Sequence, residues 1–216
     1  MPTTRVALLS VVESDVIQFE VFYDYMCPFV YRASVLLQNL GRSPNPRLNV
    51  TWRYFSLTQV NSKDDGWTVW DAPASEPARG RLAFKAAEAA RRQDRFDDFH
   101  MPLLEARHRD RLDIDQIEVI ERVAVDCGLE IERFRKDLAD PRILESLKRD
   151  HTQAISVHGV FGTPTFVFPE GAAAYIRLAE APDPAESKRV FERLVSIAAD
   201  EPSILELKRP RKPTPD

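Results

Sequence analysis

The chain has 216 residues but only two cysteines, Cys27 and Cys127, and it contains no long apolar run. So few cysteines cannot provide the dense disulfide framework of a small exported domain. No apolar stretch approaches the roughly 20 residues that a membrane-spanning helix needs. The apolar segment 6–12 is barely long enough for the core of a signal peptide, and no small-residue cleavage site follows it. We therefore expect a cytoplasmic protein that does not cross a membrane.

A dominant charge is also missing, since 30 Lys and Arg residues stand against 34 Asp and Glu residues, for a formal net charge of -4. This balance produces no global field that would attract nucleic acid or an anionic membrane, so we expect neither as a partner. The cysteines and histidines lack the spacing of zinc ligands, and we predict no metal site.

The first regular elements are a strand, a helix and a second strand. Segment 16–22 alternates apolar and polar residues before it becomes apolar, and segment 48–55 alternates again. Between them, segment 28–40 has apolar residues at helical spacing and ends at Gly41. A helix that connects two strands makes them parallel, so this order predicts a right-handed βαβ unit.

A helical block follows this unit. Residues 73–157 are rich in Ala, Arg, Glu and Leu at helical spacing, and no strand pattern interrupts them, which predicts about four helices. Asp113 is predicted to cap a helix that ends at Gly128. Asp140 and Pro141 are predicted to begin the next helix.

The C-terminal part returns to strand chemistry. Segments 165–168 and 175–178, separated by a turn at 169–171, predict a β-hairpin, and Asp183 with Pro184 begins a last helix. This order predicts an α/β fold in which a thioredoxin-like domain carries an all-helical insertion. The predicted division is a thioredoxin-like domain of residues 14–70 and 158–205, a helical insertion of residues 71–157, and flexible termini of residues 1–13 and 206–216.

Cys27 stands where a reactive thiol is expected. It follows the first strand by a short turn and precedes Pro28, which fits the first turn of a helix without the loss of a hydrogen bond. Unpaired backbone N–H groups and the positive end of the helix dipole favour a thiolate there. On position alone, a small buried apolar role remains the alternative. Cys127, beside Gly128, is expected to pack as a small hydrophobe and not to act as a resolving thiol.

A second motif lies in residues 159–166, which read Gly-Val-Phe-Gly-Thr-Pro-Thr-Phe. Pro164 comes immediately before a predicted strand, where its missing N–H would be a liability. A cis bond between Thr163 and Pro164 would resolve that liability.

These two motifs carry a family resemblance. Residues 23–30, Tyr-Asp-Tyr-Met-Cys-Pro-Phe-Val, together with residues 159–166 resemble the DsbA-like thioredoxin-fold proteins, especially cytoplasmic FrnE-like thiol-disulfide oxidoreductases. The resemblance spans nearly the whole chain, includes the helical insertion, and implies a fold of the DsbA type. It also implies that Cys27 lies beside a cis-proline loop, where backbone groups around Thr163 and Pro164 pair with a bound peptide or small thiol.

The sequence departs from the family at the resolving position. Family oxidoreductases usually carry Cys-x-x-Cys, whereas here Cys27, Pro28 and Phe29 are followed by Val30. An internal disulfide cannot form, so an external low-molecular-weight thiol such as glutathione would resolve a mixed disulfide. We expect this thiol as a cosubstrate and no tightly bound cofactor. The related kappa-class glutathione transferases and 2-hydroxychromene-2-carboxylate isomerases usually have serine in place of Cys27.

Three functions follow from these features. The favoured function is a thiol-disulfide oxidoreductase with a single active-site cysteine, acting on a disulfide or thiol adduct of a protein or small molecule. The alternatives are a glutathione-transferase or isomerase-like enzyme and a non-catalytic peptide-binding module. A homodimer is left open, because related folds often dimerise.

Several other side chains are candidates for a supporting role. Asp24 is predicted to accept a proton or to cap the turn before Cys27. Gln59 and Asn61 lie in a loop that the family places near the active cysteine, where each could bind a glutathione-like peptide. Trp67 and Trp70 could line a pocket or pack in the core. His158, on the same helix face as His151, could approach the site or only interact with the end of its helix. His100 and His108 are expected to be exposed.

Overall fold

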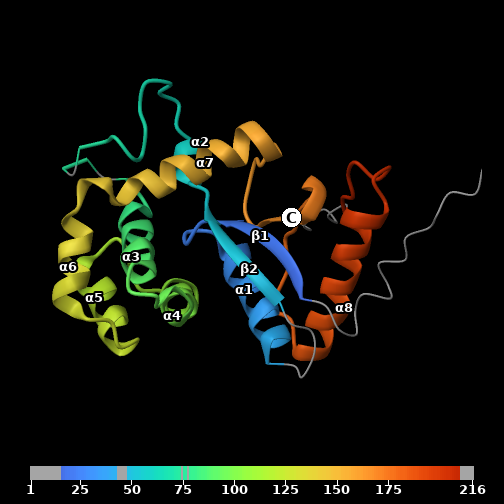
Figure 1. Ribbon diagram of the computed structural model, residues 1–216, viewed down its shortest axis with the longest axis horizontal. Coiled ribbons are helices and arrows are strands. Elements are labelled where there is room, and N and C mark those ends of the chain that lie inside the picture. The colour runs from blue at the N-terminus through green and yellow to red at the C-terminus, as the bar shows by residue number, and fades with distance from the viewer. Residues whose placement is uncertain (1–15, 43–47, 74, 77, 210–216) are drawn as a thin grey trace, which may run out of the picture.

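The computed structural model describes residues 16–42, 48–73, 75–76 and 78–209 (Figure 1). The expected flexible N-terminus of residues 1–13 lies outside this part of the chain, as do residues 210–216 of the expected C-terminal tail. Within the described ranges, no helix is both long and apolar enough to cross a membrane.

A four-stranded sheet of order β2-β1-β3-β4 forms the centre of the fold. Strand β1 (Ile17–Tyr23) runs parallel to β2 (Leu48–Tyr54), which confirms the predicted βαβ opening. Strand β3 (Thr165–Val167) pairs antiparallel with β1, and β4 (Ala173–Tyr175) pairs antiparallel with β3. These strands make the α/β thioredoxin-like fold that the sequence predicts.

The second strand of the hairpin begins earlier than predicted. The short turn η3 (Pro169–Gly171) reverses the chain at once, and the N–H of Phe168 donates to the carbonyl of Ala172 at 2.8 Å. Pairing therefore starts at alanines and not at the apolar segment 175–178, because the turn geometry sets the register of a hairpin.

Helices cover both faces of the sheet. Helices α1 (Pro28–Gly41) and α8 (Pro184–Val195) pack on one face, and α7 (Glu145–His158) lies across the other (Figure 1). As predicted, Asp183 begins α8, where its carboxylate accepts the N–H of Glu186 at 2.7 Å. The core under α1 and α8 contains Phe19, Val21, Leu36, Phe166 and Phe191, and the core under α7 contains Phe22, Phe55, Ala154, Val160 and Val167.

The remaining helices gather beside the sheet. The short α2 (Leu57–Val60) follows β2, and Figure 1 shows the next four helices together on one side of the molecule. These are α3 (Arg81–Arg91), α4 (Phe96–His108), α5 (Ile117–Asp126) and α6 (Ile131–Ala139). Helix α7 begins next to them and ends on the sheet, where Ala154 packs with Phe22 and Val167. Because α7 belongs to both groups, the division into residues 14–70, 158–205 and 71–157 stays a prediction.

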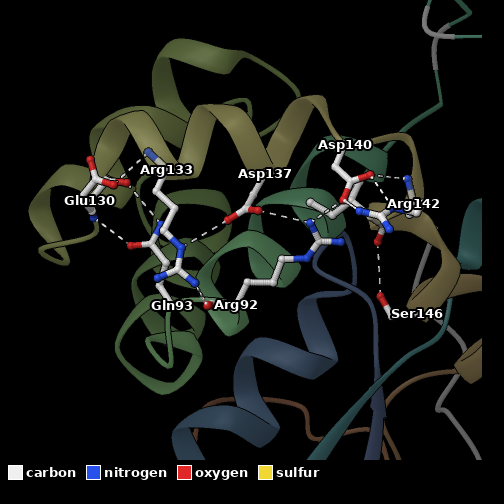
Figure 2. Close-up of polar contacts among 9 residues, drawn as sticks. Arg92, Gln93, Glu130, Arg133, Asp137, Asp140, Arg142 and Ser146 are labelled. Carbon is white, nitrogen blue, oxygen red and sulfur yellow. Dashed lines mark hydrogen bonds and ion pairs between the residues drawn. The ribbon is translucent and has the colours of Figure 1, made fainter.

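An ion-pair cluster joins α3 to α6 and to the turn that follows it (Figure 2). Arg92 contacts Asp137 at 3.3 Å and Asp140 at 2.9 Å. Asp140 also accepts the N–H of Arg142 at 2.9 Å and so begins η2 (Pro141–Leu144). The predicted Asp140-Pro141 start is present, but it opens a 3-10 turn and α7 begins at Glu145.

The predicted cap at Asp113 is wrong. Its carboxylate accepts the N–H of Asp115 at 3.1 Å and closes a turn, so helix α5 begins only at Ile117. Asp side chains readily form such turns with the backbone two residues later, which competes with helix capping. The predicted end is close to the observed one, since Cys127 caps α5 and Gly128 follows with φ of 73°.

Candidate active site

Cys27 lies at the junction between β1 and α1. It occupies the N-cap position of α1, with Pro28 at the first helical position. The side chain is 4% exposed, and the Sγ–H group donates to the carbonyl oxygen of Thr163 at 3.3 Å. A strand, a helix start and a distant loop thus hold one thiol in place.

The loop that contacts Cys27 connects α7 to β3. Gly159 ends α7 with φ of 62°, and the Thr163–Pro164 peptide bond is cis. The hydroxyl of Thr165 donates to the carbonyl of Gly162 at 2.8 Å, which closes the loop. The hydroxyl of Thr163 is buried and has no hydrogen-bond partner among the described residues. The structure therefore brings Cys27 together with Thr163, as the sequence predicts for their motifs.

Asp24 lies beneath this junction and serves the backbone. One carboxylate oxygen accepts the N–H of Met26 at 2.8 Å, and the other accepts the N–H of Leu57 at 2.7 Å. Burial raises the pKa of Asp24 to about 6, while these two N–H groups and the charge of Arg79 act in the opposite direction. With the side chain 1% exposed, the geometry favours a bridge between the active-site turn and the start of α2 over contact with substrate.

The other motif residues surround the thiol differently. Val30 is fully buried, and its N–H donates to the carbonyl of Cys27 at 3.1 Å within the first turn of α1. Phe29 is partly exposed, and two guanidinium groups lie over its ring, that of Arg177 at 4.1 Å and that of Arg32 at 5.2 Å from the ring centre. Pro28 is exposed. The motif thus presents an aromatic ring and cations at the surface above a buried apolar residue.

Gln59 and Asn61 are engaged within their own loop. The side chain of Gln59 accepts the N–H of Val69 at 2.8 Å and donates to the carbonyl of Trp67 at 3.2 Å. Asn61 donates to the carbonyl of Leu57 at 2.7 Å. In the described part of the chain, neither forms a hydrogen bond with Cys27 or with the proline loop. Their role as substrate contacts stays a prediction.

The expectation that His100 and His108 are exposed is wrong. His100 is 4% exposed and lies within hydrogen-bond distance of the hydroxyls of Tyr25, at 3.0 Å, and Ser34, at 3.3 Å. Burial and then the charge of Arg91 lower the pKa of His100 to about 3, so the ring is neutral. The charged neighbours in the sequence misled the prediction, because a helix directs adjacent residues to different faces.

His108 is partly buried against the turn that carries Cys27. Its Nε2 atom lies 2.8 Å from the carbonyl oxygen of Tyr25, and its ring stacks on Tyr31 at a centroid distance of 5.8 Å. A carbonyl can only accept, so Nε2 carries the proton. His158, in contrast, packs beside Phe22 with a distance of 5.7 Å between the ring centroids. Its buried Nε2 has no hydrogen-bond partner among the described residues.

The remaining candidates pack against the larger core. Cys127 is half-buried, burial raises the pKa of its thiol, and neither cysteine forms a disulfide. Trp67 and Trp70 also lie against this core and are partly buried. This placement agrees with a role in core packing for all three residues.

Two features of the site were missed from the sequence. Phe161 in the proline loop is 69% exposed and contacts the ring of Tyr175 at a centroid distance of 5.0 Å. Its position between two glycines of a loop is a signal that could have identified it. The second feature is a cavity of about 330 Å³ beside Cys27, lined by Met26, Pro28, Arg107, His108 and Arg111. No local sequence pattern predicts this cavity, because its lining combines Met26 and Pro28 with Arg107, His108 and Arg111 from a distant part of the chain.

Comparison with known proteins identifies the family. The model of the DSBA-like thioredoxin domain matches residues 18–177. The chain belongs to the DSBA-like thioredoxin family. This membership agrees with a thiol at the start of α1 and a cis-proline loop beside it.

Solved structures of DSBA-like proteins share the fold. A probable DsbA oxidoreductase from Streptomyces coelicolor has a TM-score of 0.61 and 20% identity, with 93% of this chain and 97% of that chain covered. The cytosolic disulfide reductase DsbM from Pseudomonas aeruginosa, solved with GSH, has a TM-score of 0.56 and 17% identity, with 82% of this chain and 98% of that chain covered.

A curated relative matches by sequence alone. The Na(+)/H(+) antiporter NhaA 1 of Mycobacterium sp. (strain KMS) is 29% identical over 167 residues, which cover 73% of this chain and 24% of the antiporter. This chain therefore matches about a quarter of the length of that relative.

Proposed function

We propose that this DSBA-like protein is a thiol-disulfide oxidoreductase that uses Cys27 as its single active-site thiol and a low-molecular-weight thiol, such as glutathione, as cosubstrate. The observation that carries this proposal is the contact of 3.3 Å between the sulfur of Cys27 and the carbonyl of Thr163, at a helix start that has no second thiol. A reducing cytoplasm would supply the cosubstrate.

The chemistry has two exchange steps. The thiolate of Cys27 attacks one sulfur of the substrate disulfide, the substrate S–S bond breaks, and the departing thiolate takes up a proton. A second thiolate, from the small thiol, then attacks the substrate-derived sulfur of the mixed disulfide, the bond between that sulfur and Cys27 breaks, and Cys27 is restored as a thiolate. When the substrate is an adduct of the same small thiol and Cys27 attacks the small-thiol sulfur of that adduct, the substrate leaves as a free thiol and the small thiol is oxidised to its symmetric disulfide.

The surroundings of Cys27 support this sequence of steps. The sulfur of Cys27 lies at the N-cap position of α1, and the cations of Arg32 and Arg177 lie near Phe29, two residues into the motif. Phe161 offers an exposed ring beside the proline loop, where a peptide segment around a disulfide could lie. The backbone around Thr163 is the natural partner for such an extended segment.

The proposal is tested by the reduction of a glutathionylated peptide with glutathione as electron donor. Cys27→Ser should abolish turnover, because it removes the attacking sulfur. Cys127→Ala should keep it, since that thiol lies at the C-terminal end of α5, away from the start of α1 that carries Cys27. Full activity of Cys27→Ser would refute the proposal.

The buried Val30 favours one alternative, a glutathione-transferase or isomerase-like enzyme that never forms a disulfide with substrate. In that case Cys27→Ser would keep thiol conjugation or isomerisation. A peptide-binding module without catalysis would instead bind peptides while Cys27 reacted no faster than an ordinary thiol. Cys27→Ser therefore separates the two enzymes, and the reactivity of Cys27 in the wild type separates both from the binding module.

A further inference from the structure

A cationic cavity adjoins the turn that carries Cys27. Its wall consists of Met26 and Pro28, the chain neighbours of Cys27, together with Arg107, His108 and Arg111. Its volume of about 330 Å³ falls at the small end of the range of small-molecule sites, roughly 300–1,000 Å³. The cavity is open to solvent and therefore has room for a small ligand next to the active-site turn.

One residue that lines the cavity, His108, is hydrogen-bonded to the active-site turn. His108, near the end of α4, donates through Nε2 to the carbonyl of Tyr25 at 2.8 Å, two residues before Cys27. Tyr31 of α1 stacks on the same imidazole. A ligand held at the end of α4 would consequently keep a fixed position relative to the start of α1.

The two arginines of the cavity differ from the arginine between them. Arg109 forms ion pairs with Glu105 at 2.9 Å and Asp110 at 2.8 Å. Over the ranges that the structure describes, neither Arg107 nor Arg111 forms an ion pair within 4 Å, and the one hydrogen bond that either donates runs from Nη1 of Arg107 to the carbonyl of Leu112, at 3.4 Å. Their charges are thus available to a ligand.

The nearest loop carries two acids whose charges interact with that of Arg107, but their carboxylates form hydrogen bonds to other groups. Asp115 accepts the N–H of Gly80 at 2.8 Å, and Asp113 accepts the N–H of Asp115 at 3.1 Å and the amide of Gln116 at 3.2 Å. Neither lines the cavity, so the lining itself carries positive charge and no carboxylate.

We infer that Arg107 and Arg111 bind a carboxylate of the small peptide thiol that reacts at Cys27. This inference rests on the proposed function and specifies its cosubstrate as an anionic thiol of the glutathione type. Guanidinium groups pair with carboxylates through charge-assisted, often bidentate, hydrogen bonds. Because Met26 and Pro28 flank Cys27, a carboxylate anchored in the cavity leaves the thiol end of a short peptide at the active-site turn. Such a site favours anionic thiols over neutral ones, because only a thiol that carries a carboxylate is held by the arginines. Binding of the carboxylate then positions the thiol sulfur for attack.

The first test measures binding without any reaction. S-Methylglutathione, which has no free thiol, is titrated into the wild type, into Arg107→Gln/Arg111→Gln and into the control Arg109→Gln by calorimetry. The double variant should bind about tenfold or more weakly, as expected for the loss of charge-assisted contacts, whereas Arg109→Gln should bind like the wild type. The wild type and the double variant should bind the diethyl ester of S-methylglutathione with equal affinity, because its carboxylates are blocked.

The second test compares cosubstrates in turnover. The ratio of kcat/KM for glutathione to that for neutral 2-mercaptoethanol should fall about tenfold in the double variant and stay constant in Arg109→Gln. Arg107→Lys/Arg111→Lys, which keeps the charge, should retain part of the preference and guards against a loss of folding.

The outcomes separate the two proposals. Equal binding of S-methylglutathione by the wild type and the double variant would refute the cavity as the carboxylate site, even if Cys27 turns over with both thiols. Carboxylate-dependent binding without any Cys27-dependent turnover would refute the proposed function and keep the binding site.

Discussion

The sulfur of Cys27 lies 3.3 Å from the carbonyl oxygen of Thr163, although 136 positions separate the two residues in the chain. This contact connects the start of α1 to the loop before β3. It places the thiol beside the backbone with which an extended substrate segment would pair. With Val30 fully buried at the resolving position, the chemistry of the site depends on what approaches from outside.

A second thiol at position 30 should let the protein resolve its own mixed disulfide without an external thiol. Val30 lies in the first turn of α1, where its N–H donates to the carbonyl of Cys27 at 3.1 Å, and it occupies the position of the second cysteine in a Cys-x-x-Cys motif. We expect Val30→Cys, in a Cys127→Ala background, to form a disulfide with Cys27 under mild oxidants. Mass spectrometry should detect the loss of two hydrogens, and the reduction of a disulfide substrate should no longer require a small thiol within the first turnover. The matched control Val30→Ala should form no such bond, and a Val30→Cys protein that keeps both thiols free would contradict the prediction.

Two threonines of the proline loop should respond in opposite ways to loss of the hydroxyl. The hydroxyl of Thr163 is buried without a partner among the described residues, while that of Thr165 donates to the carbonyl of Gly162 at 2.8 Å. Replacement of an unsatisfied buried hydroxyl by a methyl group removes a desolvation cost, so Thr163→Val should raise the free energy of unfolding by about 1 kcal/mol. Thr165→Val should lower it by about 1 kcal/mol, because a hydrogen bond is lost. Urea unfolding of both variants at one pH measures the difference, and destabilisation of equal size in both would count against this account.

Much of the fold follows from local patterns. The alternation in β1 and β2, the apolar spacing in α1 and the Asp183-Pro184 start of α8 each depend on residues that are neighbours in sequence. That the loops around Cys27 and Pro164 meet is predicted from the family resemblance of their two motifs, because the spacing of the motifs in the sequence does not indicate it.

Other parts of the site depend on contacts between distant elements. The burial of His100 is set by the aromatic rings that α4 meets, including Trp52 at a centroid distance of 4.1 Å, and its charged neighbours in sequence carry no information about them. The cavity forms because Arg107 and Arg111 line the same space as Met26. The packing of the α4 end on the active-site turn brings them together, and no local pattern predicts that packing. Gln59 shows the converse, since a polar residue in a loop near the site is used by its own backbone.

The exposed ring of Phe161 should contribute to substrate binding and little to stability. At 69% exposure it buries little surface, and surface substitutions of this kind usually change stability by less than about 0.5 kcal/mol. We expect Phe161→Ala to raise KM for a peptide disulfide several-fold while kcat for a small disulfide changes little. The control is Val125→Ala, an exposed apolar residue of α5 at 57% exposure that lies outside the proline loop. Equal effects of the two substitutions on KM would remove Phe161 from the binding surface.

The buried Asp24 should oppose two histidines in the pH dependence of stability. Burial raises the pKa of Asp24 from 3.8 to about 6, so between these values the folded chain holds a proton that the unfolded chain has lost, and Asp24 makes stability fall as pH rises. Burial lowers the pKa of His100 from 6.5 to about 3 and that of His151 from 6.5 to about 4, so the unfolded chain gains protons there as pH falls, and stability is lost below about pH 6.5. The histidines therefore outweigh Asp24, and these three groups together should cost about 1.4 kcal/mol of stability for each pH unit lowered between about 6 and 4.5.

Asp24→Asn tests the assignment, because it removes the one group of the three that opposes acid sensitivity. The variant should lose a constant amount of stability, since an amide offers one acceptor where Met26 and Leu57 each donate an N–H. Its stability should also depend on pH more steeply than that of the wild type by about one proton across the same range. Urea unfolding at half-unit steps from about pH 4.5 to 6 measures both slopes. Parallel curves for the wild type and Asp24→Asn would mean that Asp24 is ionised throughout this range in the folded protein, and its pKa would then lie near the ordinary value for an aspartate.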